Sequence, residues 1–272
     1  MKGNGDMTIR ELARATRRDV LEMGFRCGGA GAHFGGSLSL VEIISVLFGE
    51  VFRVHGVVRD RFVFSKGHGV MTQYAVMKNL GLLNSEQLET FKKDGSPIAA
   101  HPSMNAELGI DFSSGSLGQG LSLGVGSALG LRRKGDVDTR VYVLLGDGEC
   151  DEGSVWEAAM SASRFGLDNL IAIVDRNRLQ YDGDTEDVMP LGDFASKWNA
   201  FGWAVIECDG HDMSALSIAF KAEHRCRPLV VIADTIKGKG VSFMERQASW
   251  HNGVLTKSLY EQAIKELEVV GA

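Results

Sequence analysis

Two apolar runs about one helix apart constrain the fold of this chain more than any other feature. Val141 to Leu145 and Leu170 to Val174 are nearly continuous apolar segments, as expected for parallel strands that helices cover on both faces. A helix predicted from about Ser154 to Phe165 lies between them, which makes the segment a βαβ unit. The two strands are therefore neighbours, and their carboxyl ends, where α/β sheets bind ligands, lie side by side.

Polar side chains stand at both of these strand ends. The first strand runs into Gly146-Asp147-Gly148-Glu149, and the second runs into Asp175-Arg176-Asn177. A carboxylate and an amide oxygen placed together suit Mg²⁺, which prefers few protein ligands and the phosphates of a substrate. The residue types alone are equally consistent with a simple turn. Neither GxGxxG nor GxxxxGK[ST] follows the first strand, which disfavours dinucleotide and P-loop sites.

A second strand, turn and helix carry a histidine. Residues 60–65 form a predicted short strand, which runs into Gly67-His68-Gly69 and a helix predicted from Val70 to Leu80. Amide groups at the start of a helix attract phosphate, and a histidine placed there can donate a further hydrogen bond. The segment is therefore a candidate phosphate site.

The amino-terminal region contains two predicted caps and a glycine-rich stretch. Thr8 and Glu11 form a capping box for the first helix, and Ser39 and Glu42 are predicted to cap a helix from Leu40 to Phe48. Between them, Gly35 and Gly36 mark a place where the backbone bends or approaches another group closely.

Five glycines interrupt another predicted helix, in the segment GSLGQGLSLGVGSALGLRRK. Each glycine costs about 1 kcal/mol relative to alanine in a helix. We therefore expect this helix to pack closely against a strand, a partner helix or a ligand.

The remainder of the chain repeats the βαβ rhythm. Helices are predicted for 193–201 and 213–222, strands for 203–207 and 229–234, and a last amphipathic helix from about Thr256. The two lysines of the segment 235–240, TIKGKG, face either phosphate or solvent. No linker or repeat divides the chain, so residues 1–272 are predicted to form a single three-layer α/β/α domain with a mainly parallel sheet.

Composition excludes several classes of protein. The net charge of −6 argues against nucleic acid as the main partner, because binding to a phosphate backbone needs a basic face. The chain lacks a signal-peptide pattern and any run of 18 apolar residues, and its four cysteines form no C-x-x-C pair. We therefore expect a soluble cytoplasmic protein that does not bind a membrane.

The histidines lack zinc-site spacing. Four of them, His33, His68, His101 and His251, lie in predicted loops and suit proton transfer or the orientation of hydroxyls and phosphates.

The segments GDGECDEGSVWEA and IVDRNRLQYDG resemble those of transketolases, within the thiamine diphosphate enzymes. DRFVFSKGH and GSLGQG are similar to further transketolase segments, and the resemblance covers nearly the whole chain. It implies the thiamine diphosphate-binding fold of the diphosphate domain. It also implies that Asp147, Asn177 and the main-chain carbonyl of Leu179 hold Mg²⁺, or Ca²⁺ or Mn²⁺, against the diphosphate.

The same resemblance implies roles for further residues. It places His68 and His251 on the diphosphate side of the site and His33 and His101 at the hydroxyl groups of the donor sugar. Glu152 would lie at a subunit interface and share protons with the catalytic glutamate of a partner. The remaining residues implied to bind the cofactor lie in two glycine-containing turns: Gly115, Ser116, Leu117, Gly146, Gly148 and Glu149.

The implied reaction transfers a two-carbon ketol unit from a ketose to an aldose. The pyrimidine-binding and C-terminal domains of a full transketolase have no counterpart here, so the resemblance implies an α2β2 assembly with a separately encoded partner subunit. Two alternatives remain, a noncatalytic scaffold or regulatory relative and the α subunit of a 2-oxoacid dehydrogenase. Three positions beside the expected substrate channel or cofactor depart from the family pattern and leave the sugar undefined: Ala100, Ser116 and Asn252. Arg178 also departs from it, because the family often has a second asparagine there.

Overall fold

A five-stranded sheet forms the centre of the computed structural model, which describes residues 7–53 and 59–270. The strand order is β1-β2-β3-β5-β4, and all neighbouring strands run parallel. The strands are β1 (Arg61–Phe64), β2 (Val141–Gly146), β3 (Leu170–Arg176), β4 (Ala204–Asp209) and β5 (Leu229–Asp234). The predicted βαβ unit is confirmed, because β2 pairs with β3 and a helix connects them.

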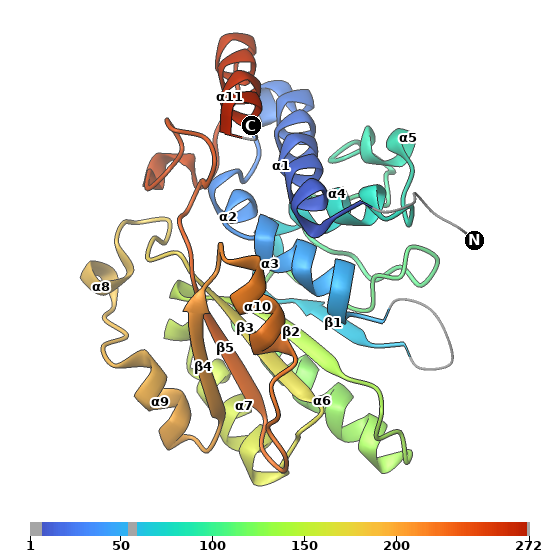
Figure 1. The fold of residues 1–272 in the computed structure, drawn as a ribbon, viewed down its shortest axis with the longest axis vertical. Helices are drawn as coiled ribbons and strands as arrows, with labels where there is room; N and C mark the ends of the chain where they lie inside the picture. Colours follow the sequence, from blue (N-terminus) through green and yellow to red (C-terminus); the bar gives the residue numbers. More distant parts are fainter. Residues whose placement is uncertain (1–6, 54–58, 271–272) are drawn as a thin grey trace.

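Helices cover both faces of the sheet (Figure 1). One face packs against α1 (Ile9–Arg26), α3 (Val41–Val46), α4 (Met71–Asn79) and α10 (Met213–Phe220), and the other against α6 (Gly120–Arg133), α7 (Gly153–Arg164) and α9 (Phe194–Ala200). Alternate residues of each strand serve the two cores: Tyr142 and Leu144 of β2 join the first, and Val143 and Leu145 join the second. This confirms the predicted three-layer α/β arrangement.

Shorter elements complete the described chain. They are α2 (Gly35–Leu38), α5 (Ser85–Leu88), α8 (Thr185–Val188) and the helical turns Gly28–Ala30, Leu47–Val51, Gly67–Gly69, Gly148–Asp151 and Ala248–Trp250. The last helix, α11 (Lys257–Val270), packs against α1, where the rings of Phe25 and Tyr260 stack with their centroids 4.4 Å apart. Between α5 and α6 the chain forms a long irregular loop.

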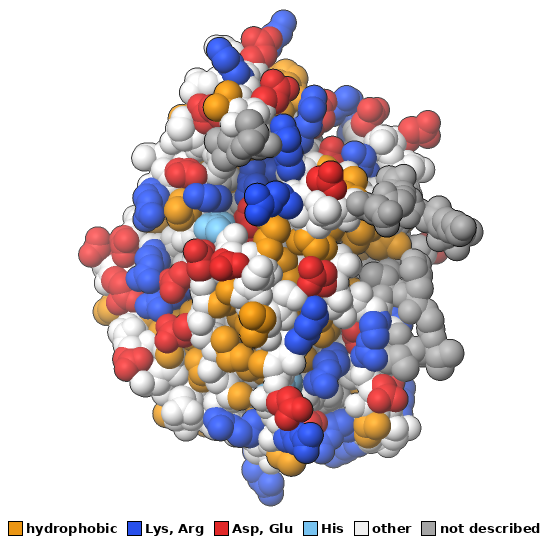
Figure 2. Space-filling view, in the orientation of Figure 1, with side chains coloured by type: hydrophobic (Ala, Val, Ile, Leu, Met, Phe, Trp, Pro, Cys, Tyr) orange, Lys and Arg blue, Asp and Glu red, His pale blue; other side chains and the backbone are white. Residues whose placement is uncertain are grey.

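Acidic and basic side chains are interspersed on the face shown in Figure 2, with hydrophobic side chains gathered around α10 at its centre. Ile218 of this helix is 73% exposed. In the described ranges 7–53 and 59–270, no helix is both long and apolar enough to span a membrane.

The capping predictions have different outcomes. The Thr8–Glu11 capping box is confirmed at the start of α1. The predicted cap by Ser39 and Glu42 is wrong. Ser39 lies between the end of α2 and the start of α3, and no side chain caps the start of α3. Ser39 donates to the distant Asp175 at 2.7 Å, and Glu42 pairs with Arg17. Both side chains are buried, so long-range partners replace the local cap.

The glycines of α6 divide into two groups. A Cβ atom on Gly120 would lie 2.2 Å from the hydroxyl oxygen of Ser65, and one on Gly124 would lie 2.4 Å from the Cγ2 of Val143. Gly126 and Gly130, in contrast, have nothing within 4 Å of such an atom. Close packing against a strand is therefore the reason for two of the glycines in the described structure.

We predict opposite effects of alanine at two of these positions in the isolated chain. Gly124→Ala lowers the free energy of unfolding by about 1 to 3 kcal/mol, because the new methyl group overlaps Val143. Gly126→Ala is the matched control and raises it by up to about 1 kcal/mol through helix propensity. Urea unfolding followed by circular dichroism measures both. Equal effects of the two substitutions would contradict the packing argument.

Candidate functional site

A pocket opens at the carboxyl ends of β2 and β3. The turn after β2 supplies Gly146 to Glu149, the segment after β3 supplies Asn177 and Leu179 to Tyr181, and five other segments complete the wall. These contribute Gly36, Lys66, His68, Leu117, Lys237 and His251. The structure therefore brings together the two strand ends that the sequence places side by side.

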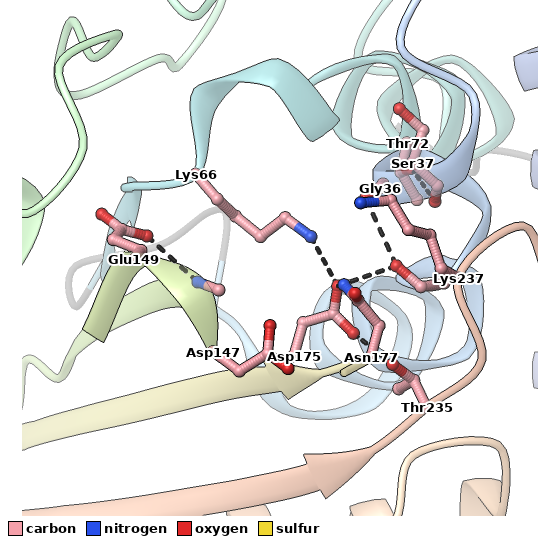
Figure 3. A network of polar contacts seen from close by, with 12 residues as sticks. Gly36, Ser37, Lys66, Thr72, Asp147, Glu149, Asp175, Asn177, Thr235 and Lys237 are labelled. Atoms are coloured by element: carbon pink, nitrogen blue, oxygen red, sulfur yellow. Dashed lines mark hydrogen bonds and ion pairs between the residues drawn. The ribbon is translucent and has the colours of Figure 1, made fainter. Parts of the chain in front are cut away.

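The carboxylate of Asp175 links four segments beneath this pocket (Figure 3). One of its oxygens accepts hydrogen bonds from Lys66 Nζ at 2.5 Å, Ser39 Oγ at 2.7 Å and Asn177 Nδ2 at 2.9 Å, and the other accepts from the hydroxyl of Thr235. Asp175 is fully buried. Burial raises the pKa of its carboxyl group, but Lys66 and the hydroxyl donors outweigh burial and lower the pKa below its usual value.

Asp147 stands beside this network at the end of β2. Its two carboxylate oxygens accept from the backbone N–H groups of Gly148 at 2.9 Å and Arg178 at 2.6 Å. Burial and the nearby charge of Asp175 raise its pKa to about 6. Asp175 has an ion-pair partner, Lys66, whereas the described structure gives the buried carboxylate of Asp147 none. A buried carboxylate without an ion-pair partner favours a bound cation.

The other two predicted metal ligands lie in the same wall. Asn177 Oδ1 accepts from the N–H of Leu179 at 3.1 Å, and the carbonyl of Leu179 accepts from Lys237 Nζ at 2.7 Å. An ammonium group thus already lies against this carbonyl. Carboxylate, amide and carbonyl oxygens form a donor set that fits a hard divalent cation. Within the described part of the chain, no group of three or more His, Cys, Asp and Glu side chains is arranged to hold a metal.

Arg178 separates the two residues that supply these oxygens. Its backbone has a φ of 64°, a left-handed conformation that is uncommon for residues other than glycine and asparagine. Its guanidinium donates to Asp234 Oδ1 at 2.7 Å. The arginine that departs from the family pattern therefore occupies a conformation that asparagine adopts at lower cost.

Four imidazoles lie together at the pocket and its mouth. The ring centroid of His33 is 5.6 Å from His68, 6.0 Å from His101 and 5.5 Å from His251, and His68 and His251 are 5.0 Å apart. Burial, followed by neighbouring positive charges, lowers the pKa of all four, to about 4 for His33 and about 3 for His251. At neutral pH these rings are uncharged, so each can both donate and accept a hydrogen bond.

The sequence does not decide which lysines belong to the pocket. Lys66 was not among the predicted site residues, although it directly precedes Gly67-His68-Gly69. Lys237 lies in the segment whose lysines face either phosphate or solvent, and the structure buries it in the pocket, with Nζ 3.0 Å from His251 Nδ1. Burial, with the charge of Lys66, lowers the pKa of Lys237 to about 8. Lys239 instead lies 3.7 Å from Glu245 and is partly exposed.

Two glycines make room for these side chains. A Cβ atom on Gly35 would lie 2.9 Å from Lys237 Cγ, and one on Gly36 would lie 3.1 Å from the ring of His68. Neither glycine has a positive φ. Of the two roles predicted for them, close approach is therefore the one that the structure supports.

The remaining predicted residues lie at different places around the pocket. Leu117 lines it, whereas Gly115 and Ser116 lie in an exposed loop and line a neighbouring depression. Glu149 lines it, but its carboxylate accepts from the hydroxyl of Ser65 and from two backbone N–H groups. Glu152 lies outside, at the exposed start of α7.

A family model described as "Transketolase, thiamine diphosphate binding domain" matches residues 13–268. The chain is 39% identical to a subunit of the apulose-4-phosphate transketolase of Phocaeicola vulgatus, over 96% of this chain and 94% of that protein. It is 41% identical to the 6-deoxy-6-sulfo-D-fructose transketolase subunit of Clostridium sp., over 88% of this chain and 90% of that protein. Human transketolase is 40% identical over 84% of this chain, which corresponds to 37% of the human protein.

Solved transketolases share the fold. The enzyme from Campylobacter jejuni superposes with a TM-score of 0.86 at 28% identity, and the enzyme from Leishmania mexicana with 0.83 at 28%. Each match covers 96% of this chain. The chain spans only 42% and 41% of the length of these two proteins.

We predict that Lys66→Met lowers the free energy of unfolding by about 3 to 5 kcal/mol, because it leaves the charge of Asp175 buried without its partner. The double variant Lys66→Met/Asp175→Asn removes that charge as well and recovers a large part of the loss. Urea unfolding measures both variants. A loss below about 1 kcal/mol in the single variant would show that the ion pair does not organise the site.

Proposed function

The chain belongs to the transketolase family, and on that premise we propose that it is the diphosphate-binding subunit of a thiamine diphosphate- and Mg²⁺-dependent transketolase. Its activity would be the transfer of a two-carbon ketol unit from a ketose to an aldose. The observation that carries this proposal is the meeting of Asp147, Asn177 and the Leu179 carbonyl in one pocket with two buried lysines.

The pocket residues would bind the cofactor through its diphosphate. Asp147, Asn177 and the carbonyl of Leu179 would hold Mg²⁺, or Ca²⁺ or Mn²⁺, which in turn holds phosphate oxygens. Lys237, whose Nζ lies beside the Leu179 carbonyl, adds positive charge, and the neutral ring of His68 donates a hydrogen bond. When bound, the thiazolium of the cofactor supplies the electron sink for cleavage of the carbon–carbon bond.

The histidines at the mouth of the pocket would act on the sugar. His33 and His101 are uncharged at neutral pH because burial lowers the pKa of both rings, so they can orient the hydroxyls of the donor by donating or accepting. His251 lies between His33 and Lys237 and would hold a proton near the diphosphate end. The relatives are named for a ketose phosphate and a sulfonated ketose, and we assign a ketose donor to this chain as well.

We further propose that activity requires a separately encoded partner in an α2β2 assembly. The pyrimidine-binding and C-terminal domains of a transketolase would come from this partner. Two relatives that the chain matches over nearly their whole length are named as subunits. Exposed apolar side chains lie just before α6 and on α6 and α7. Leu117 is 39% exposed, Leu123 of α6 is 40% exposed and Met160 of α7 is 53% exposed. Glu152, exposed at the start of α7, would meet the catalytic glutamate of the partner there.

Asp147→Asn is expected to weaken Mg²⁺-dependent binding of thiamine diphosphate by at least about 100-fold, since losing even an indirect support of a metal ligand costs 10- to 100-fold. The side chain keeps its shape but loses the charge that the cation needs. Isothermal calorimetry with the chain assembled with its partner subunit measures the affinity. Asp182→Asn, in an exposed turn near the pocket, is the matched control and leaves it unchanged. Unchanged affinity in Asp147→Asn would refute the metal site.

The purified chain is expected to show no ketol transfer alone and to gain it when the partner subunit is added. The assay follows aldose-dependent consumption of a ketose in the presence of thiamine diphosphate and Mg²⁺, with oxidative decarboxylation of a 2-oxoacid as the alternative reaction. Ketol transfer by this chain without a partner would refute the subunit proposal. Decarboxylation without ketol transfer would refute the proposed reaction.

A further inference from the structure

A buried polar network behind the pocket connects three elements that do not line it. Arg17 Nη2 of α1 lies 2.6 Å from Glu42 Oε1 of α3, and His211 Nδ1, after β4, lies 2.9 Å from Glu42 Oε2. The three side chains are 11%, 8% and 15% exposed. Burial raises the pKa of Glu42, but Arg17 and His211 outweigh it and lower the pKa to about 2. Glu42 is therefore an anion at every pH at which the protein is used.

The backbone determines which nitrogen of His211 carries the proton. The N–H of Ile236 donates to His211 Nε2 at 2.9 Å. A backbone N–H can only donate, so Nε2 accepts and Nδ1 carries the proton that it donates to Glu42. The imidazole thus links a buried carboxylate to the residue directly before Lys237.

Two further contacts hold the other side of Lys237. The N–H of Gly238 donates to the carbonyl of Gly35 at 3.0 Å, and Arg17 Nε donates to the carbonyl of Lys239 at 3.2 Å. The backbone on both sides of Lys237 is therefore fixed to α1, α2 and α3. The ammonium group of Lys237 lies in the pocket against the carbonyl of Leu179 (Figure 3). The anchored backbone fixes the point from which the side chain reaches this position.

We propose that Glu42 and His211 are positioning residues for Lys237, and that the affinity of the pocket for a diphosphate depends on them although neither lines it. The inference rests on the proposed function, because it takes this pocket to be the diphosphate site. Glu42 orients the ring of His211, the ring holds the N–H of Ile236, and the next residue directs its ammonium group toward the phosphates.

Two substitutions of His211 separate its two hydrogen bonds. The amide of glutamine reaches the level of Nε2 and can still accept from Ile236, whereas the shorter amide of asparagine reaches only the level of Nδ1. We expect His211→Asn to weaken the binding of thiamine diphosphate with Mg²⁺ about tenfold, the effect of losing one backbone hydrogen bond. His211→Gln should stay within about threefold of the unsubstituted protein. Calorimetry with the full chain, assembled with its partner subunit, measures each affinity.

A double-mutant cycle tests whether His211 acts through Lys237. Lys237→Met removes the ammonium group, so adding His211→Asn to that variant should cause no further loss of affinity. A purely structural role of His211 would instead produce the same tenfold loss in both backgrounds. Equal losses, or an unchanged affinity in His211→Asn alone, would overturn the proposal.

Glu42→Gln provides an independent variant if His211→Asn does not fold. Arg17 can only donate, so the glutamine oxygen must face it, and the amide N–H₂ then faces the Nδ1–H of His211. Moving the ring proton to Nε2 relieves this conflict but ends the bond to Ile236. The same tenfold loss is expected, and only when Lys237 is present.

The binding of thiamine diphosphate by the unsubstituted chain, assembled with its partner subunit, distinguishes the two proposals. If that assembly fails to bind the cofactor with Mg²⁺, the proposed function fails. If it binds, and the effects of His211→Asn or Glu42→Gln add to that of Lys237→Met, only the positioning role fails.

Discussion

The buried carboxylate of Asp175 is the constraint on which the rest of the site depends. An anion with no access to water needs partners in every direction, and its four donors come from four separate segments of the chain: Ser39, Lys66, Asn177 and Thr235. Each of these segments also forms or directly adjoins part of the pocket wall. Satisfying one buried charge thus brings the ligand-binding segments together before any ligand is bound.

Beside this ion pair, Asp147 and Lys237 each lie buried without an ion-pair partner in the described structure, an arrangement that suits an anionic ligand held by a cation. Lys66 is engaged by Asp175, while Asp147 has only backbone and hydroxyl donors, and its pKa rises to about 6. Lys237 lies in the same pocket with a pKa lowered to about 8. A divalent cation beside Asp147 and phosphate oxygens beside Lys237 would relieve both of these unfavourable environments. The pocket is therefore better suited to a metal–diphosphate pair than to either component alone.

The neutral imidazoles lie next to these charges: His68 and His251 line the same pocket, and the ring of His33 lies beside both. His33 lies within 6.0 Å of each of the other three rings, so the four could not all be protonated without strong repulsion, and burial already disfavours the charged forms. Neutral rings can donate to one hydroxyl and accept from another, which suits a ligand with many hydroxyl groups. The fold thus places charge where phosphate is expected and neutral hydrogen-bonding groups where a sugar is expected.

The sequence by itself determined the βαβ unit, the parallel sheet and the proximity of the strand ends that carry Asp147 and Asn177, because buried parallel strands are continuous apolar runs and their ends must adjoin. The four histidines were identified by resemblance, and the fold brings their rings together. The sequence could not determine the partners of Ser39 and Glu42, because local capping and a long-range buried bond use the same atoms. Nor could it decide between phosphate and solvent for Lys237, since a lysine in a loop is usually exposed. Only the tertiary structure decided these cases, because burial removes water as a competing partner and leaves each polar group to whatever the folded chain places next to it.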